Sequence, residues 1–205
     1  MGYIGGSANN QASQATQNVD SRQKVTFYKT YVSTAELLLN DCESQPEESI
    51  YGIIASIITL NIQALEAYAN HKLKELVDQN KIPKDKYENY ISKMLLDKFN
   101  HLYDFFEKTF YQGKEPIQSV SALIQLRNRL VHFLPEWSDE DGKNNKVLRN
   151  LQGKFNFNDK ELFPRNVLVK ECAYWSNNSV KEFLTVCDSD LTMKRTEDNR
   201  NGKVV

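Results

Sequence analysis

The stretch IIASIITLNIQALEAYAN, residues 53–70, decides the fold of this 205-residue chain. Its apolar residues recur at intervals of three and four, which is the spacing of one face of an α-helix. The most apolar part, residues 53–60, is interrupted by Ser56 and Thr59 and is far too short to span a bilayer. We therefore expect the stretch to be the buried part of a long helix in a helical bundle.

The same helical period runs through most of the chain on both sides of this stretch. Five helices are indicated, with approximate bounds of 28–39, 44–79, 83–106, 117–131 and 164–186. Pro46 fits the first turn of the second helix, within a capping-box spacing, and Pro135 stops the fourth. Strand-like alternation is almost absent, and only residues 147–157 have the pattern of a short extended piece. The predicted fold class is all-α, an up-and-down bundle of about five helices.

Two tails and one loop interrupt the helical pattern. Residues 1–20 are poor in apolar side chains and rich in Gly, Ser, Asn and Gln, so they are expected to form a flexible N-terminal arm. Residues 192–205 are expected to be a flexible C-terminal tail, which leaves a helical domain over residues 21–191. The polar loop 136–162 is longer than a typical connection, so it is expected to hold a short turn of structure or to serve a function.

Charge and cysteine content narrow the possible functions. The chain has 26 Lys and Arg residues against 27 Asp and Glu residues, so binding to nucleic acid would depend on a local basic patch. The three cysteines, Cys42, Cys172 and Cys187, have no zinc-like spacing, and their odd number argues against a disulfide framework. We therefore expect a cytoplasmic protein without a membrane anchor, a metal or another cofactor.

The most informative polar residues lie in the sequence RNRLVH, residues 127–132, at the end of the fourth predicted helix. Arginine is a forked clamp for phosphate, and histidine is the side chain best suited to moving protons near neutral pH. Asn128 and Arg129 lie four and three residues before His132, so they share its side of the helix. Arg127 lies about 140° around the axis from His132, so the two meet only if the helix end loosens or the arginine wraps around it.

A carboxylate interrupts the apolar stripe of the second predicted helix. Glu66 falls among Ile62, Ala69 and Leu73, and burying a carboxylate alone is costly. Arg127 or Arg129 is the expected partner of Glu66. Asn70, four residues further on, is placed to join the same polar pocket.

These residues resemble the HEPN domain family. Arg127-Asn128-x-x-x-His132, late on a helix of an all-α bundle, looks like the R-x(4–6)-H signature of that family. The stretch from residue 64 to residue 70, which contains Glu66, is similar to the acidic helix that accompanies the signature. The resemblance covers roughly residues 47–187, and it departs from some toxin members at Leu134, where those continue to a tyrosine.

The resemblance implies a metal-independent endoribonuclease that works as a homodimer, with the two motifs meeting at the interface, in microbial defence or stress. On that reading His132 is the acid and base of RNA cleavage by the 2′-hydroxyl, and Arg127 grips the scissile phosphate. Asn128 orients groups, and Glu66 holds an arginine in place. The competing hypothesis is a non-enzymatic helical module that binds a nucleotide, RNA or a protein partner. A further alternative is the toxic half of a two-component system, silenced by a protein antitoxin.

A basic cluster in the polar loop is the predicted phosphate-tracking surface if RNA binds. Its members are Lys143, Lys146, Arg149 and Lys154. Such a cluster is usually only a solvated loop, but positive charge along the path of a strand supplies most of the non-specific affinity for RNA. Arg129 is expected to contribute to the same RNA-binding surface.

Overall fold

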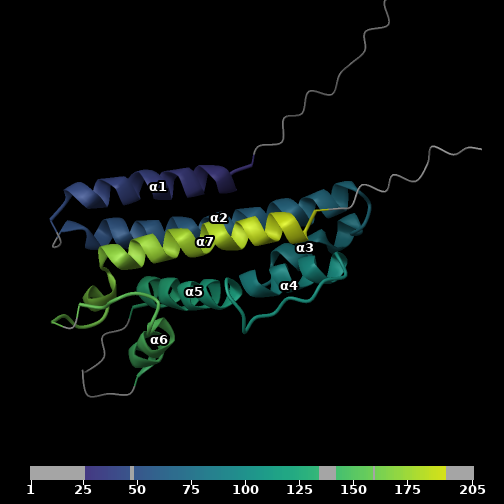
Figure 1. The fold of residues 1–205 in the computed structure, drawn as a ribbon. Helices are drawn as coiled ribbons and strands as arrows, with labels where there is room; N and C mark the ends of the chain where they lie inside the picture. Colours follow the sequence, from purple (N-terminus) through teal and green to yellow (C-terminus); the bar gives the residue numbers. More distant parts are fainter. Residues whose placement is uncertain (1–25, 47–48, 134–141, 159, 193–205) are drawn as a thin grey trace, which may run out of the picture.

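The computed structural model describes residues 26–46, 49–133, 142–158 and 160–192, and these residues form helices and connecting turns without a strand (Figure 1). The all-α fold class is therefore confirmed. The described residues form seven α-helices, rather than about five. The arm predicted over residues 1–20 and all but the first residue of the tail predicted over residues 192–205 lie outside the described residues.

The seven helices, in chain order, are α1 Tyr28–Ser44, α2 Tyr51–Asp78, α3 Tyr87–Ile91, α4 Leu95–Phe105, α5 Ile117–Val131, α6 Lys143–Leu151 and α7 Lys170–Asp190. A short 3₁₀ turn, Lys84–Lys86, precedes α3. A second, Arg165–Val167, follows Pro164. α2 is the central helix and contacts α1, α4, α5 and α7. Figure 1 shows α1, α2 and α7 lying along one another. α4 and α5 lie on the side of α2 and α7 that is opposite to α1, and α6 lies below α5.

The core is built mainly on the residues of α2. Five of its fully buried apolar side chains follow the three-and-four spacing of the sequence: Ile54, Ile57, Ile58, Leu65 and Leu73. α2 is also long and apolar enough to cross a membrane by length and composition alone, although half of its most apolar window is buried inside the bundle. Because the central helix of a soluble bundle has the same properties, the structure is compatible with a soluble protein.

Three boundaries differ from the sequence prediction. Ser44 is the last residue of α1, and Gln45 is extended, as the residue before a proline tends to be. α2 begins only at Tyr51, so the predicted capping box at residues 44–47 is not at its start. The third predicted helix is divided into α3 and α4. At the division, the Ser92 hydroxyl donates to the carbonyl of Asn89, and Met94 is extended. Side-chain bonds of this kind compete with helix continuation.

The polar loop contains α6, so the prediction of an extended piece over residues 147–157 was wrong for its first half. Val147 and Leu151 are buried and four residues apart, which is the spacing of one helical face. The last helix begins at Lys170, six residues later than Pro164, because Pro164 instead starts a 3₁₀ turn. Pro135, the predicted stop of the fourth helix, lies outside the described residues, but α5 ends at Val131 as expected.

Candidate functional site

The residues of the RNRLVH motif lie at the C-terminal end of α5. His132 is the C-cap of the helix, with non-helical backbone angles of φ −108° and ψ 43°. Its backbone N–H still donates to the carbonyl of Asn128, at 3.0 Å, and the side chains of both residues are exposed. Because α5 is helical through Val131 and His132 keeps this helical hydrogen bond, the separation of about 140° around the axis between Arg127 and His132 remains.

Arg127 is half-buried, and its Nε atom is buried without a hydrogen-bond acceptor in the described part of the chain. It lies four residues after Leu123 and seven after Val120, which are buried, so its side chain starts on the core face of α5. A buried N–H group without an acceptor destabilises a protein by about 1–3 kcal/mol. This Nε atom has almost no contact with solvent, so an acceptor from outside the chain would reach it only after the side chain moves.

Apolar side chains flank His132 on the surface. Val131 is 56% exposed and Phe133 is 39% exposed, and both count among the large exposed apolar residues of the described chain. The ring of Phe133 lies 6.1 Å from that of Phe163, in the segment that leads to α7. The motif therefore lies at the end of the bundle where α7 begins (Figure 1), and the surface around it is partly apolar.

Glu66 is not beside the motif, and the prediction that an arginine neutralises it was wrong. Its carboxylate contacts Nζ of Lys98 on α4, and the same Nζ donates to Oδ1 of Asn70 at 2.9 Å. The prediction that Asn70 joins the polar group of Glu66 is confirmed. Glu66 lies about 22 Å along α2 from Tyr51, the first residue of this helix. At that distance α2 is packed against α4, which provides the cation in place of the end of α5.

Arg129 is buried, and its Nε donates to Oδ1 of Asn144 in the first turn of α6. Asn144 is also buried. This contact joins α5 to α6, and the buried Arg129 side chain is therefore part of the packing between the two helices. The prediction that Arg129 belongs to an exposed RNA-binding surface therefore does not agree with its position.

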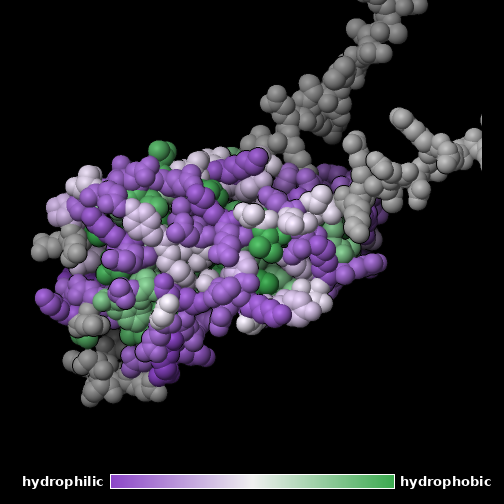
Figure 2. Space-filling view, in the orientation of Figure 1, coloured by the Kyte–Doolittle hydropathy of each residue, from purple (hydrophilic) through white to green (hydrophobic). Residues whose placement is uncertain are grey.

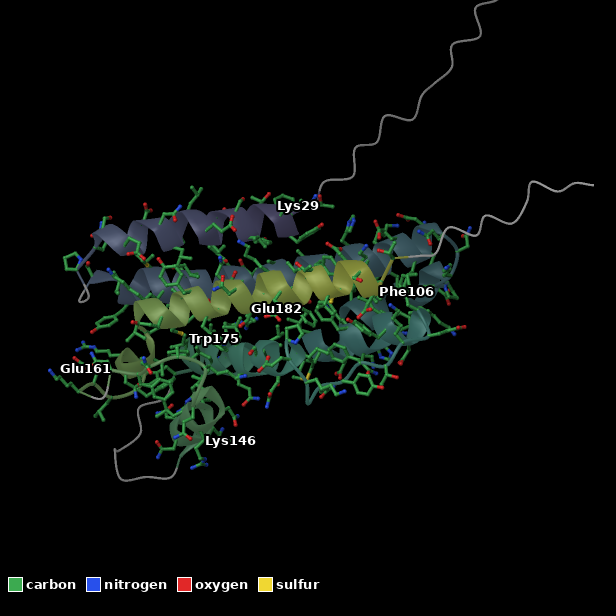
Figure 3. All side chains as sticks on the ribbon, viewed as in Figure 1. Lys29, Phe106, Lys146, Glu161, Trp175 and Glu182 are labelled. Carbon is green, nitrogen blue, oxygen red and sulfur yellow. The ribbon has the colours of Figure 1, made fainter. Side chains whose placement is uncertain are left out.

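The basic residues of the polar loop lie mostly on α6. Lys143, Lys146 and Arg149 are exposed and recur every three residues, so they form a stripe within an arc of about 120° that we call the basic stripe. Figure 3 labels Lys146 at the outer side of α6, and Figure 2 shows the surface over this helix as strongly hydrophilic. Lys154 is turned toward α5 instead, where it contacts Glu115 and donates to Ser119 Oγ at 3.1 Å.

A cavity of about 370 Å³ lies between the starts of α2 and α7 and the segment that follows α6. Its lining includes the aromatic rings of Tyr51 and Phe157 and the cations Lys160 and Lys170. The guanidinium of Arg165 lies 5.8 Å from the centre of the Tyr51 ring. The sequence did not predict this cavity, because its walls join the start of α2 to segments more than 100 residues later in the chain, and these share no motif.

The cysteines are structural in this fold. All three are free and buried, and burial raises the pKa of each thiol, that of Cys187 to about 12. A thiol that stays protonated is a poor nucleophile and a poor metal ligand. Within the described ranges, no group of three or more His, Cys, Asp or Glu side chains is arranged to hold a metal ion.

Comparison of the chain with protein-family models, with curated proteins and with solved structures found no match in any of the three. The resemblance to HEPN domains therefore depends on the residues of the chain itself. Of the predicted catalytic residues, the structure brings Arg127, Asn128 and His132 to one end of α5 and leaves Glu66 with Lys98.

Proposed function

We propose that the chain is a metal-independent endoribonuclease of HEPN type, in which the ends of two α5 helices form one RNA-cleaving site. The observation that carries the proposal is a half-buried Arg127, whose buried Nε has no acceptor among the residues that the structure describes, five residues before an exposed histidine. The outer guanidinium nitrogens of this half-buried side chain would bind the scissile phosphate. Arginine binds phosphate oxygens through two parallel hydrogen bonds, which also neutralise the charge that develops in the transition state.

Cleavage of RNA by its own 2′-hydroxyl requires one group that removes the proton of that hydroxyl and another that protonates the leaving 5′-oxygen. One chain supplies a single histidine at this point, His132. A two-fold dimer would supply a second histidine and a second Arg127, so each chain would complete the site of the other. Asn128, which is exposed four residues before His132, would orient the phosphate or the 2′-hydroxyl.

The surface around His132 supports a second copy of the chain as the partner. The exposed Val131 and Phe133 would leave water in such a dimer, and burial of apolar surface is the main driving force for association. Phe133→Asp should therefore convert the dimer to a monomer in light scattering and lower RNA cleavage with it. A monomeric wild-type protein that cuts RNA at full rate would contradict the shared site.

The basic stripe on α6 is the proposed path of the RNA backbone away from the site. It belongs to the helix that α5 holds through Arg129 and Asn144, so it has a fixed position relative to the motif. Lys146→Ala should weaken RNA binding to a similar extent for all sequences. It should also reduce the slope of log affinity against log salt by about one.

The direct test uses single-stranded RNA in the presence of EDTA. His132→Ala and Arg127→Ala should each lower the cleavage rate at least about 100-fold while the helical circular dichroism stays unchanged. His101→Ala and Lys108→Ala are the controls and should retain activity, because His101 lies on α4 and Lys108 pairs with Asp190 at the other end of α7, away from the motif. Wild-type dimer that cuts no RNA, or full activity in His132→Ala, would overturn the proposal.

A nucleotide-binding module is the second candidate, and the cavity between α2 and α7 favours it. Two aromatic rings for a base and two lysines for phosphates line a space of about 370 Å³, within the usual size of small-molecule sites. Adenine nucleotides should then raise the melting temperature, and Lys160→Ala should reduce the shift. Nucleotide binding without RNA cleavage would favour this candidate over the ribonuclease.

A further inference from the structure

A polar pocket of about 490 Å³ lies between α5 and the end of α6. Its walls are rich in side-chain amides: Gln112, Gln118, Gln125, Asn150 and Gln152. An amide carries a hydrogen-bond donor and an acceptor side by side, without net charge. The edges of nucleobases present the same pairs of groups, and Asn and Gln pair with them through two hydrogen bonds.

We propose that this pocket binds one unpaired base of the RNA and thereby sets which sequences are cut. The proposal rests on the proposed ribonuclease function and adds the element that selects its substrate. Single-stranded RNA is read in this way by proteins, through hydrogen bonds to the edges of unstacked bases.

The free hydrogen-bonding groups of the pocket fit such a ligand. The side chains of Gln112, Gln118 and Gln152 make no hydrogen bond within the described residues. Asn150 Nδ2 donates to Gln125 Oε1 at 2.7 Å, which leaves the Gln125 amino group and the Asn150 carbonyl available. Both bonded amides are thereby oriented before a base arrives.

Two cations, Lys154 and Arg149, line the pocket beside the amides. Lys154 lines the pocket, but its Nζ contacts the Glu115 carboxylate and donates to Ser119 Oγ at 3.1 Å. Its positive charge is therefore compensated by a carboxylate. The amides then provide the recognition of the base, and Arg149, which also belongs to the basic stripe, would contact the phosphate attached to that base.

The pocket is aligned with the proposed cleavage site along one helix face. Gln118, Gln125 and His132 are spaced seven residues apart, which places them on the same side of α5. Gln118 lies about 21 Å along the helix axis from His132. Arg149 belongs both to the basic stripe and to the lining of the pocket. A strand held at the motif by its phosphate, and along α6 by the basic stripe, would thus bring a base a few nucleotides away into the pocket.

The test maps cleavage positions in an RNA pool that contains all four bases at every position. Wild-type protein should prefer one base by about tenfold at a fixed number of nucleotides from the cut. The double variant Gln118→Leu, Gln152→Leu should reduce that preference to less than about twofold. Total cleavage of the pool should remain, because Arg127 and His132 are unchanged. Gln63→Leu, an exposed glutamine on α2, is the matched control and should keep the wild-type preference.

The outcomes separate this inference from the proposed function. Cleavage without any base preference, or a preference that survives in the double variant, would overturn the inference and leave the ribonuclease proposal standing. Fluorescence anisotropy with A, C, G and U homo-oligomers covers the case in which wild-type protein does not cut. Base-selective binding that the double variant loses would then support the pocket while the ribonuclease proposal fails, and absence of both binding and cleavage would overturn the two together.

Discussion

Lys98 of α4 and Glu66 of α2 form an ion pair whose two partners differ sharply in burial. The lysine side chain is 1% exposed, whereas that of the glutamate is 41% exposed. The ammonium group therefore depends on this carboxylate, and on the carbonyl oxygen of Asn70, for its charge and hydrogen-bonding needs. Removing one member of such a pair costs more than the pair contributes, because the buried charge is left without compensation.

The first prediction concerns this pair. Glu66→Gln should lower the free energy of unfolding by about 1–2 kcal/mol, a value reduced by the partial exposure of the carboxylate. Urea unfolding followed by circular dichroism measures the change. Glu36→Gln removes the partner of Lys181 from an exposed pair and should change stability by less than about 0.5 kcal/mol. Equal effects of the two substitutions would contradict a structural role for Glu66.

The second prediction concerns the contact between Arg129 and Asn144. Arg129→Ala should leave buried polar groups of α6 without a donor and lower stability by about 1–3 kcal/mol. It should also speed limited proteolysis between α5 and α7, because α6 loses a contact that anchors its first turn. Lys146→Ala, an exposed substitution on the same helix, should stay within about 0.5 kcal/mol of wild type. Unchanged proteolysis in Arg129→Ala would show that α6 is held by other contacts.

The sequence predicted the helices best where the apolar period was long. α2 buries residues at the spacing read from its sequence, and α5 ends where the motif indicated. The prediction failed where a local hydrogen bond ends a helix or where a helix is short. The division between α3 and α4 depends on extended Met94 and on the Ser92 hydroxyl, and neither is visible as a change of period. α6 has only nine residues, too few for the period to be distinguished from an extended segment.

The candidate site was only partly predictable for a related reason. The motif is local, so one helix brings Arg127, Asn128 and His132 together. The partner of Glu66 is 32 residues away in the chain, and the choice between Lys98 and an arginine depends on which helix packs against the middle of α2. The burial of Arg129 likewise depends on the place of α6, a helix that the sequence did not indicate.

The third prediction concerns the end of α4. Glu107 has a positive φ of 55°, a conformation that strains residues with a Cβ atom. The backbone needs it, because the N–H groups of Glu107 and Lys108 donate to the carbonyls of Asp104 and Tyr103, as in a Schellman motif. Glu107→Gly should raise stability by about 0.5–1 kcal/mol, or the melting temperature by about 1–4 °C.

Asn80 provides the matched control for this substitution, because it has a φ of 56° at the equivalent position after α2. Asparagine tolerates this region better than glutamate does, so Asn80→Gly should gain less than Glu107→Gly. Thermal unfolding of the two variants beside wild type measures the difference. A lower melting temperature for Glu107→Gly would show that the glutamate side chain contributes more than its strained backbone costs.

The fourth prediction concerns pH and the contact between Glu115 and Lys154. Burial raises the pKa of the Glu115 carboxyl, but hydrogen bonds from Lys154 and Ser119 outweigh burial and hold the pKa below its usual value. The unfolded chain therefore binds this proton more tightly than the folded chain does. The stabilisation by Glu115 is complete at neutral pH, begins to fade as the pH falls to about 4.3, the ordinary value for glutamate, and is lost below the folded pKa.

Glu115→Gln should consequently lower the melting temperature at pH 7 by about 1–2 °C, a small shift because the glutamate side chain is 48% exposed. The difference from wild type should shrink as the pH falls below about 4.3 and should be smallest at the most acid pH at which both proteins still fold. Glu182→Gln, on the exposed side of α7, is the control and should show no such pH dependence. A Glu115→Gln difference that stays constant or grows toward acid pH would mean that Lys154 does not hold Glu115 in its ionised form. The polar pocket between α5 and the end of α6 would then lack the ion pair that compensates the charge of Lys154 in its wall.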